Sequence, residues 1–481
     1  MNNVPNTFDI IVIGSGSGLD VASAAAERGL KVAIIEKDKM GGTCLNRGCI
    51  PSKLLIHSAD IIETIKKAYV FGIDVKGFSV DFNKIMKRVN GITDSDSDSI
   101  NNALKESENP KLFAGECRFV GDKRIAIRTR NDEKDQIITA EKILVAVGSQ
   151  PRIPKIMGLL ESNYITSDEA LRLKKQPRKL ILIGGGYIAC ELAHFFGSLG
   201  TEIHIIQRNN VLIPSEDEEI SQKFTEIFSK KYNVYLGYTA ESISNNNGSN
   251  ESNDTKRSFK VVAKNSSGKR LEIDSDQILL SVGRVPNTSK LNLDETGVKV
   301  NESGFINVDE YLETNVKGIF ALGDVVGRYQ FKHSANLEAQ YAFNNILHTD
   351  NKNPVNYAAM PHAIFTSPQI SGVGFTEQEL RKKGIDYVKS TYPYIHTGMG
   401  QAIEDKEGFV KFLVDPKNRS ILGCHIIGTD SSILIHEVLV AMRTGNGTID
   451  SITNTIHIHP ALSEVVARTA SSIQDRELFG S

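Results

Sequence analysis

The 481-residue sequence has no excess of either charge, since 56 lysines and arginines stand against 58 aspartates and glutamates. A formal net charge of -2 at pH 7 gives no electrostatic reason to expect nucleic acid or a membrane surface as a partner. No apolar run approaches the roughly 18 residues that a membrane helix needs. The first residues lack the basic start and apolar stretch of a secretory signal. We therefore expect a soluble, cytoplasmic protein.

Cysteine is also scarce, with five residues in the whole chain. So few cannot form a disulfide scaffold, and an intracellular disulfide is more often catalytic than structural. Cys44 and Cys49 form the one close pair. We expect the remaining cysteines, which are isolated in the sequence, to be inert packed side chains: Cys117, Cys190 and Cys424.

What the sequence does have is a dense motif at residues 41–53, Gly-Gly-Thr-Cys-Leu-Asn-Arg-Gly-Cys-Ile-Pro-Ser-Lys. Zinc would need four ligands, and no second cysteine or histidine cluster lies at ligand spacing, so no metal site is expected. A structural bridge over so short a loop would stabilise the fold little. These arguments favour a redox role for Cys44 and Cys49.

Two segments repeat the order strand, glycine turn, helix, strand, which is the unit that binds a dinucleotide. The first spans residues 10–37, with Gly14 and Gly16 in its turn. The second spans residues 180–208, and its turn begins at Gly184. One glycine-rich turn is weak evidence, but two in this context predict an α/β fold with two Rossmann-like dinucleotide-binding domains.

The rest of the chain predicts how these units are divided into domains. Apolar strands at residues 142–148 and 277–283 end at glycine, and we expect them to be crossovers that leave and re-enter the first domain. Residues 244–258 are too polar to bury and predict a mobile hairpin loop of unassigned role. Beyond residue 350, short β-rich runs mix with a helix at 432–444, which indicates an α+β domain. The predicted domains are a discontinuous first one at 1–150 and 280–350, a second at 151–279 and a third at 351–481.

The motif at residues 41–53 closely resembles the active-site signature of the flavin-dependent pyridine nucleotide–disulfide oxidoreductases, which include dihydrolipoyl dehydrogenase and glutathione reductase. The resemblance covers essentially the whole chain. It implies FAD in the first domain, NAD or NADP in the second, and a C-terminal domain through which two subunits form a homodimer. It also implies an enzyme that moves electrons between the nicotinamide coenzyme and a thiol or disulfide.

In the FAD domain, Gly14 permits a tight turn and Gly16 lets the backbone approach the pyrophosphate. Glu36 ends the second strand 20 residues after Gly16, where a carboxylate can bind the ribose hydroxyls. The third fingerprint position falls on Leu19, which departs from the family pattern, and we expect Gly18 to ease the packing instead. The other FAD contacts implied by the resemblance are Gly42, Thr43, Lys53, Gly148, Gly323 and Asp324, the last reaching the ribityl chain.

The resemblance also gives roles to the redox residues. In the family the second cysteine lies against the flavin and the first exchanges with substrate, so Cys49 and Cys44 take these roles. Lys53 resembles the lysine near flavin N5, and Glu191 resembles the carboxylate that balances its charge.

The segment His457-Ile-His459-Pro-Ala-Leu-Ser-Glu464 resembles the family element that supplies the general base. By position His459 is that base, and Glu464 holds its imidazole in the required tautomer. His457 is expected to be a hydrogen-bonded neighbour. In the family this element enters the active site of the partner subunit, which again implies a homodimer.

The nicotinamide coenzyme is expected at the second glycine turn. NAD-specific members of the family carry an acidic residue near the end of the following strand, whereas NADP users carry arginines. This chain has Gln207 and Arg208 there, which leans towards NADP. The full set of expected NAD(P) contacts is Gly184, Gly186, Tyr187, Ala189, Gln207, Arg208 and Gly283.

Different motifs of the sequence point to different substrates. Residues 49–53 and 457–464 look like dihydrolipoyl dehydrogenase, and we put first the oxidation of dihydrolipoamide by NAD(P)⁺. Residues 14–18, 207–208 and 331–338 look more like NADPH-dependent reductases of low-molecular-weight disulfides, of the mycothione, bis-γ-glutamylcystine or glutathione type. The partner is then a small thiol or disulfide, or a lipoyl-bearing protein. A non-catalytic flavoprotein scaffold is a third hypothesis, and the intact set of redox residues argues against it.

Overall fold

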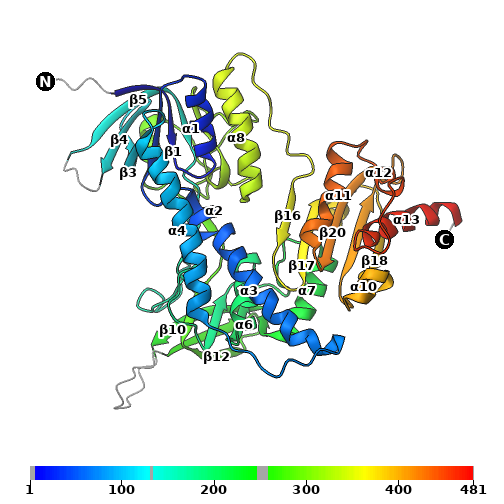
Figure 1. The fold of residues 1–481 in the computed structure, drawn as a ribbon. Coiled ribbons are helices and arrows are strands. Elements are labelled where there is room, and N and C mark those ends of the chain that lie inside the picture. The colour runs from blue at the N-terminus through cyan, green and yellow to red at the C-terminus, as the bar shows by residue number, and fades with distance from the viewer. Residues whose placement is uncertain (1–5, 130–133, 246–257, 480–481) are drawn as a thin grey trace, which may run out of the picture.

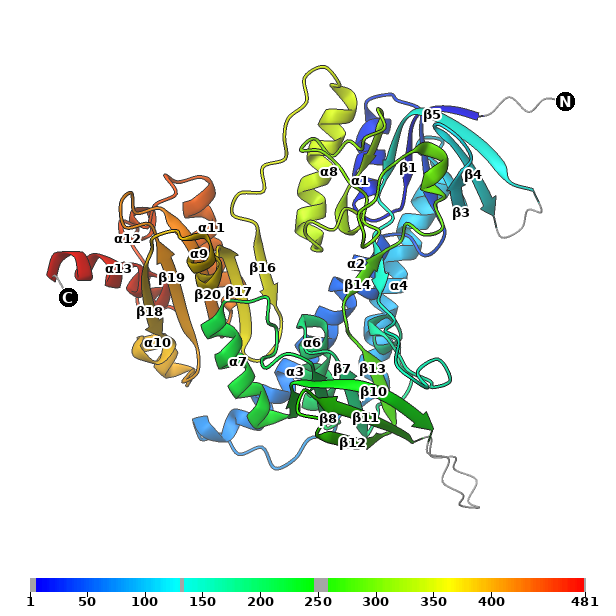
Figure 2. The same cartoon turned by 180° about the vertical axis from the view of Figure 1, so that it is seen from behind.

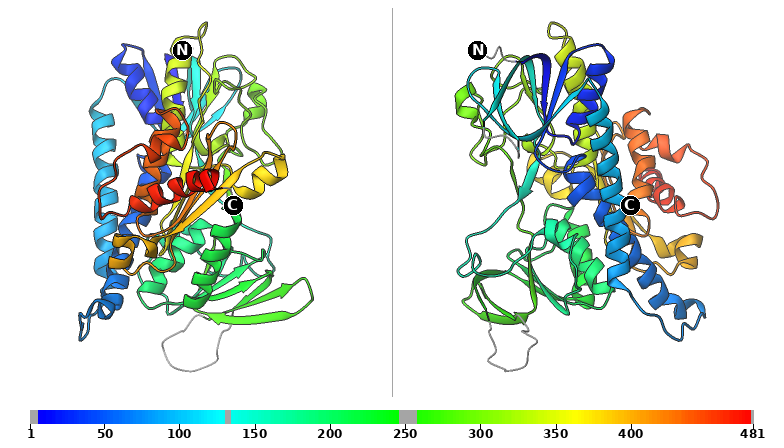
Figure 3. Two further views of the ribbon diagram at one scale, coloured as in Figure 1. Left: turned by 90° about the vertical axis from the view of Figure 1, so that its right-hand side faces the viewer. Right: turned by 60° about the vertical axis from the view of Figure 1, so that its left-hand side comes forward.

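The computed structural model describes residues 6–129, 134–245 and 258–479, which form three regions that each contain β-sheet (Figure 1). Helices α3 and α4 lie side by side and run from the first sheet towards the second, as the right-hand view of Figure 3 shows. Among the described residues, no helix combines the length and apolar character needed to span a membrane.

The first region contains a six-stranded mixed sheet. Its central strand β1 is buried on both faces because Ile10 to Ile13 are all apolar, and it pairs in parallel with β2 and β5. In chain order the elements are β1 (Asn6–Ile13), α1 (Gly18–Glu27), β2 (Val32–Glu36), α2 (Gly42–Arg47), α3 (Cys49–Lys67), η1 (Ala68–Phe71), α4 (Phe82–Glu106), β3 (Lys111–Phe119), β4 (Arg124–Thr129), β5 (Gln136–Val145) and β6 (Ser149–Pro151), and, after the second region, β14 (Arg284–Pro286), η2 (Leu293–Thr296), β15 (Ile319–Ala321), η3 (Gly323–Val325) and α8 (Lys332–Leu347).

The second region contains a four-stranded parallel sheet in the order β13-β7-β8-β9 and a three-stranded antiparallel sheet β10-β11-β12. Its elements are α5 (Ser167–Ala170), β7 (Lys179–Ile183), α6 (Tyr187–Ser198), β8 (Glu202–Gln207), α7 (Glu218–Lys231), β9 (Asn233–Leu236), β10 (Tyr238–Asn245), β11 (Phe259–Asn265), β12 (Arg270–Ser275) and β13 (Gln277–Leu280). Strands β10 and β11 pair antiparallel up to Asn245 and Phe259, as predicted for a hairpin. Most of the predicted loop, residues 246–257, lies outside the described residues.

The two glycine turns have the same geometry. Gly14 has φ +106° and Gly184 has φ +108°, and a Cβ on either would come within 2.4 Å of a carbonyl oxygen, that of Ala146 or Ser281. The predicted strands at 142–148 and 277–283 were therefore too long at their carboxyl ends. They end at Val145 and Leu280 because the chain beyond them turns to pack against the glycine of each unit. Both sites require glycine for conformation and for space.

The two crossovers between the regions are paired with each other. Strand β6 pairs antiparallel with β14, with Ser149 opposite Pro286 and Pro151 opposite Arg284. Figure 2 shows β14 in the connection between the first and second regions. The two connections between the regions therefore run side by side as one antiparallel pair of strands.

The third region is a five-stranded antiparallel sheet in the order β16-β17-β20-β19-β18. Helices α11, α12 and α13 share an apolar core with this sheet, as predicted for an α+β unit. Its elements are β16 (Pro361–Ile364), β17 (Gln369–Gly374), α9 (Glu377–Lys383), β18 (Val388–Pro393), η4 (Tyr394–His396), α10 (Gly398–Ala402), β19 (Phe409–Val414), β20 (Ile421–Gly428), α11 (Ser431–Arg443), α12 (Asp450–Thr453) and α13 (Glu464–Phe479).

A buried ion cluster joins the third region to the second. Lys411 on β19 is fully buried and its Nζ lies 2.8 Å from Oδ1 of Asp217, which caps α7. The same ammonium contacts Glu377 at the start of α9. Burial raises the pKa of Glu377, but hydrogen bonds from Lys411 and Tyr387 outweigh burial and hold it at about 2. The cluster therefore contributes stability only while its carboxylates are ionised.

We predict that Lys411→Met lowers the free energy of unfolding by about 3–5 kcal/mol near neutral pH, because it leaves buried carboxylates without their cation. In the wild type, the contribution of Glu377 is complete above the ordinary glutamate pKa and is lost as pH falls towards about 2. The variant's carboxylates are protonated more readily, so its deficit shrinks as the medium is acidified. Urea unfolding at neutral and mildly acidic pH measures both effects.

Lys389→Met is the matched control, since Lys389 contacts Glu377 at 3.2 Å but is 35% exposed. We expect it to cost no more than about 1 kcal/mol. Equal losses for the two variants would contradict the interpretation.

Candidate active site

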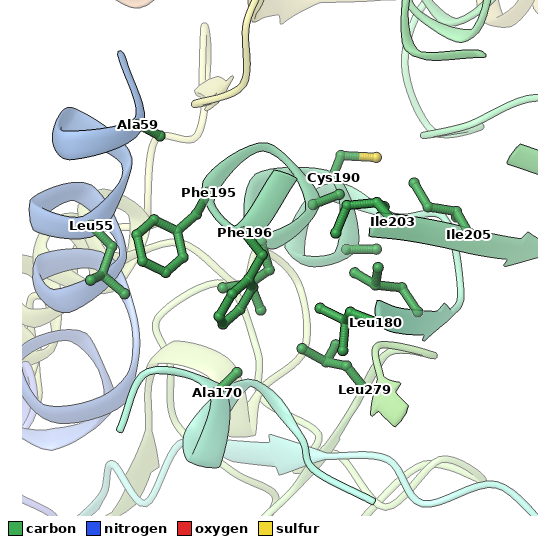
Figure 4. Packing of buried hydrophobic residues seen from close by; sticks show 14 of the residues in the cluster. Leu55, Ala59, Ala170, Leu180, Cys190, Phe195, Phe196, Ile203, Ile205 and Leu279 are labelled. Atoms are coloured by element: carbon green, nitrogen blue, oxygen red, sulfur yellow. The ribbon is translucent and has the colours of Figure 1, made fainter. Parts of the chain in front are cut away.

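Apolar packing brings helix α3, which begins at Cys49, against helix α6 of the second region. Leu55 and Ala59 of α3 belong to the same buried cluster as Phe195 and Phe196 of α6 (Figure 4). The two phenylalanine rings lie 4.8 Å apart between centroids, in an edge-to-face arrangement. Because α3 begins at the second cysteine and α6 begins at the second glycine turn, this core fixes the two motifs relative to each other.

Lys53 and Glu191 meet at the end of this contact. The Lys53 ammonium lies 2.9 and 2.8 Å from the two carboxylate oxygens of Glu191, whose side chain is 9% exposed. The backbone N–H of Phe365 also donates to Glu191, at 3.0 Å, and the Phe365 ring lies 4.5 Å from the Lys53 ammonium. The sequence predicted the pair, and the geometry brings it together.

Cys44 lies in the short helix α2 and Cys49 is the first residue of α3. Both are free thiols, with Cys44 half-buried and Cys49 exposed. A hydrogen bond with Cys44 lowers the pKa of Cys49 to about 7, burial opposes this, and the Lys53 charge assists it. The same hydrogen bond and burial raise the pKa of Cys44. The pair can therefore hold one proton and one negative charge, with the thiolate at Cys49.

The first glycine turn supports α2 directly. A Cβ on Gly42 would come within 2.8 Å of the Gly16 Cα, so the chain before Cys44 rests on the turn. A Cβ on Gly18 would lie 2.9 Å from side-chain atoms of Val12 and Ala146. Gly18, and not Leu19, is therefore the residue that lets α1 pack closely, as expected.

The remaining residues of the first turn fit a dinucleotide. Gly16 faces open space on its Cβ side. Glu36 accepts hydrogen bonds from the N–H and hydroxyl of Ser15, at 2.9 and 2.7 Å. A cavity of about 1260 Å³ begins at Glu36 and is lined by Phe113 and Arg128 among others. A carboxylate at the strand end beside a large cavity suits an adenosine ribose, so the donor set fits FAD.

Asp324 belongs to a network that sequence reasoning missed. The Ser149 hydroxyl donates to Asp324 at 2.5 Å and accepts from the Arg284 guanidinium at 2.7 Å. Gly323 has φ +75°, and its N–H donates to the buried carboxyl of Glu338 at 2.6 Å. A Cβ built on Gly148, the residue before Ser149, would lie 3.9 Å from the Thr43 hydroxyl, so these two expected FAD residues are neighbours.

At the second turn, Gly186 caps α6, and Tyr187 and Ala189 occupy its first turn. Tyr187 is 37% exposed, whereas Ala189 is buried. Gln207 is buried as well, and its amide donates to the Val211 carbonyl at 3.2 Å. Arg208 beside it is exposed.

Gly283 completes the second site with φ +104° and open space on its Cβ side. Of the Gln207–Arg208 pair, Gln207 is therefore hydrogen-bonded to the backbone, whereas Arg208 is exposed.

His459 and Glu464 are paired as expected. The His459 Nδ1 lies 2.9 Å from a Glu464 oxygen, which leaves Nε2 to accept a proton. The imidazole side chain is 74% exposed. His457 is hydrogen-bonded to Glu437 and to the Thr455 carbonyl, the neighbour role predicted for it. In Figures 1 and 2 the sheet of the third region lies between α13, which begins at Glu464, and α2, which contains Cys44.

Three site residues were missing from the sequence predictions: Phe365, Ser149 and Arg284. Ser149 and Arg284 directly follow the glycines that end the two crossover segments, and this adjacency was the available signal. Phe365 had none, because it reaches Glu191 from the third region. In the part of the chain that the structure describes, no group of three or more His, Cys, Asp or Glu side chains is placed to hold a metal ion.

We predict that Lys53→Met raises the pKa of Cys49 from about 7 towards the ordinary thiol value, because the thiolate loses the positive charge that helps to lower its pKa. At neutral pH the ionised fraction of Cys49 then falls. The ultraviolet absorbance of the thiolate, titrated against pH in reduced protein, measures this. Lys67→Met, at the exposed end of the same helix, is the control and leaves the titration unchanged. An unaltered titration in Lys53→Met would remove the lysine from thiolate stabilisation.

Comparisons with known proteins agree with this geometry. Residues 8–339 match the family model "Pyridine nucleotide-disulphide oxidoreductase", and residues 360–470 match the dimerisation domain of the same family. Dihydrolipoyl dehydrogenase of Chlamydia muridarum is 34% identical over 482 residues, covering 98% of each chain. Mycothione reductase of Mycobacterium tuberculosis is 34% identical over 475 residues, covering 96% of this chain and 98% of the relative.

A solved structure is similar as well. The Cu(II) complex of the HOCl-induced flavoprotein disulfide reductase RclA from Escherichia coli superposes with a TM-score of 0.85 at 27% identity, covering 97% of this chain and 100% of that one. Matches of this extent, together with the paired cysteines and the two glycine turns, establish the family. The chain belongs to the pyridine nucleotide-disulphide oxidoreductases and is a disulfide oxidoreductase that carries the dimerisation domain of that family.

Proposed function

We propose that this enzyme oxidises a dithiol to a disulfide, with dihydrolipoamide or a protein-bound dihydrolipoyl group as substrate and NAD(P)⁺ as electron acceptor. The observation that carries the proposal is the Cys44–Cys49 pair beside the Lys53–Glu191 ion pair, at the junction of two dinucleotide turns. The 34% identity to a protein named dihydrolipoyl dehydrogenase supports the choice of substrate.

The family membership implies FAD and a nicotinamide coenzyme, and we propose residues for each. FAD would be held by Gly14, Gly16, Glu36, Gly42, Thr43, Lys53, Gly148, Gly323 and Asp324. When bound, it supplies two-electron transfer between the cysteine pair and the coenzyme. The coenzyme would be held by Gly184, Gly186, Tyr187, Ala189, Arg208 and Gly283, with Gln207 supporting the loop. The FAD domain would then be residues 1–150 and 280–350, the NAD(P) domain 151–279 and the interface domain 351–481.

The dithiol half-reaction follows from thiol chemistry. With Cys44 and Cys49 joined as a disulfide, one substrate thiolate attacks the Cys44 sulfur and the Cys49 sulfur leaves as a thiolate. The Lys53 charge makes Cys49 the better leaving group. The second substrate thiol loses its proton to His459 and attacks the substrate sulfur bound to Cys44, which releases Cys44. Cys44 leaves as a thiolate and takes the proton back from His459, while Cys49 stays a thiolate. The substrate has lost two electrons and two protons, one of which ends on Cys44 and the other in solvent, released when the first substrate thiol ionised.

A homodimer completes this site in our proposal. The sheet of the third region lies between α13, which closely follows His459 in the sequence, and α2, which contains Cys44 (Figure 1), so the base that serves Cys44 would be His459 of the partner subunit. The match of residues 360–470 to a dimerisation domain supports this arrangement. The cytoplasmic location expected from the sequence stays a prediction.

A second candidate function is NADPH-dependent reduction of a low-molecular-weight disulfide. Arg208 is exposed beside the second glycine turn, where a guanidinium suits the 2′-phosphate of NADP. The similarity to a protein named mycothione reductase supports this candidate. The same cysteine exchange, run in reverse, would perform it.

Steady-state assays of the FAD-loaded enzyme decide between the two. Dihydrolipoamide oxidation is compared with reduction of mycothione, bis-γ-glutamylcystine and glutathione disulfides, each with both coenzymes. Efficient dihydrolipoamide turnover supports the first function, and NADPH-driven reduction of one disulfide supports the second. If Arg208 binds the 2′-phosphate, Arg208→Ala raises KM for NADP(H) about tenfold or more and leaves KM for NAD(H) unchanged. Arg270→Ala on β12 of the same region is the control. No turnover of any substrate would refute both functions.

We predict that His459→Ala lowers kcat for dithiol oxidation about a hundredfold or more, because the second substrate thiol then lacks its base. Rapid-mixing measurement of enzyme reduction by dihydrolipoamide isolates this half-reaction. His348→Ala, at the end of α8, serves as the control and keeps the wild-type rate. A wild-type rate in His459→Ala would exclude the residue from the reaction.

A further inference from the structure

Lys332, the first residue of α8, lies on the glycine turn of the first region. Its ammonium is 2.9 Å from the hydroxyl of Ser17, which caps α1, and 2.5 Å from the amide oxygen of Asn336. Ser17 and Asn336 are themselves joined at 3.0 Å. Two segments far apart in the sequence, residues 14–18 and 331–338, thus hold one lysine side chain in a fixed position.

The charge of Lys332 is held but not cancelled. Ser17 and Asn336 present neutral oxygens, so they orient the ammonium and leave its charge intact. The nearest carboxylate, Asp20, is 3.9 Å away with a side chain that is 61% exposed, and an exposed pair of this kind is strongly screened. The Lys332 side chain is 33% exposed. A positive charge therefore faces accessible space beside the turn.

Cys44 rests on the same turn. Gly42, two residues before Cys44, packs against Gly16, one residue before Ser17. The positive charge of Lys332 acts on the Cys44 thiol, opposing the rise in its pKa that Cys49 and burial cause. Cys44 is the thiol that exchanges with substrate in the proposed reaction, so the ammonium acts electrostatically at the reacting sulfur.

We propose that Lys332 is a specificity-determining residue that favours thiols and disulfides bearing a carboxylate over neutral ones. The inference rests on the proposed function for the role of Cys44, and it adds a preference for the anionic over the neutral form of a thiol or disulfide. A fixed positive charge raises the local concentration of an anion and leaves a neutral molecule of the same shape unaffected.

Alkylation of Cys44 tests the charge without any turnover. Iodoacetate and iodoacetamide have nearly the same shape and form the same sulfur–carbon bond with loss of iodide, but only the first is an anion. Their rates at Cys44 are measured in reduced, FAD-loaded protein by peptide mass spectrometry. We expect Lys332→Met to lower the ratio of the iodoacetate rate to the iodoacetamide rate about five- to tenfold. Lys332→Arg keeps the wild-type ratio.

The controls separate charge from folding and from FAD binding. Lys290→Met, a 76% exposed lysine on the same region, leaves the ratio unchanged. In the wild type, added salt lowers the ratio because it screens the attraction, and this holds even if Lys332→Met folds poorly. An unchanged ratio in Lys332→Met with full FAD content overturns the inference. A loss of FAD with an unchanged ratio overturns it too, since Lys332 would then serve the cofactor.

Kinetics with two dithiols complete the test. Dihydrolipoate and dihydrolipoamide differ only in a carboxylate against a neutral amide. In Lys332→Met we expect kcat/KM for dihydrolipoate to fall about fivefold or more through KM, with dihydrolipoamide unaffected. If neither dithiol reacts with the wild type, the dithiol function fails, while the alkylation ratio still decides the role of Lys332. Equal losses for both dithiols overturn the inference.

Discussion

The packing of α3 on α6 is the constraint on which the site depends. Helix α3 belongs by sequence to the first region, yet Leu55 and Ala59 are buried among side chains of the second region. Sliding one helix along the other would expose these residues and separate Lys53 from Glu191 at the same time. The ion pair has one partly exposed member and cannot itself hold two regions together. Apolar burial supplies the adhesion, and the charges determine what chemistry the junction supports.

The sequence predicted most of what is local. The apolar strand runs, the positions of Gly14 and Gly184 and the cysteine spacing each follow from a short window, because turn conformation and strand burial act over a few residues. The paired residues Lys53 and Glu191 were also predicted, but by family resemblance. Strand ends were less accurate, since β5 ends at Val145 only because a distant glycine turn packs against the residue that follows.

Contacts between regions account for what the sequence did not predict. Phe365 reaches Glu191 from the third region, and no spacing or composition near residue 365 signals this. Likewise, residues 14–18 and 331–338 had separately suggested a small-disulfide reductase, but their meeting through Ser17 and Asn336 is a tertiary event. Burial against another part of the chain can give an ordinary residue a position that no local pattern encodes.

The pairing of strands β6 and β14 affects how the chain tolerates insertions and deletions. Arg152 donates its N–H to the Gly283 carbonyl at 2.9 Å, so the entry and exit of the intervening stretch lie side by side. Because the two ends of the segment between Arg152 and Gly283 are adjacent, this segment connects to the first region as a short hairpin loop would. Closing such a loop costs the first region little conformational entropy. The second region can therefore lengthen or shorten its own loops, the β10–β11 connection included, without shifting the first glycine turn. Natural diversification of the second region can proceed inside this boundary while the first region keeps its geometry.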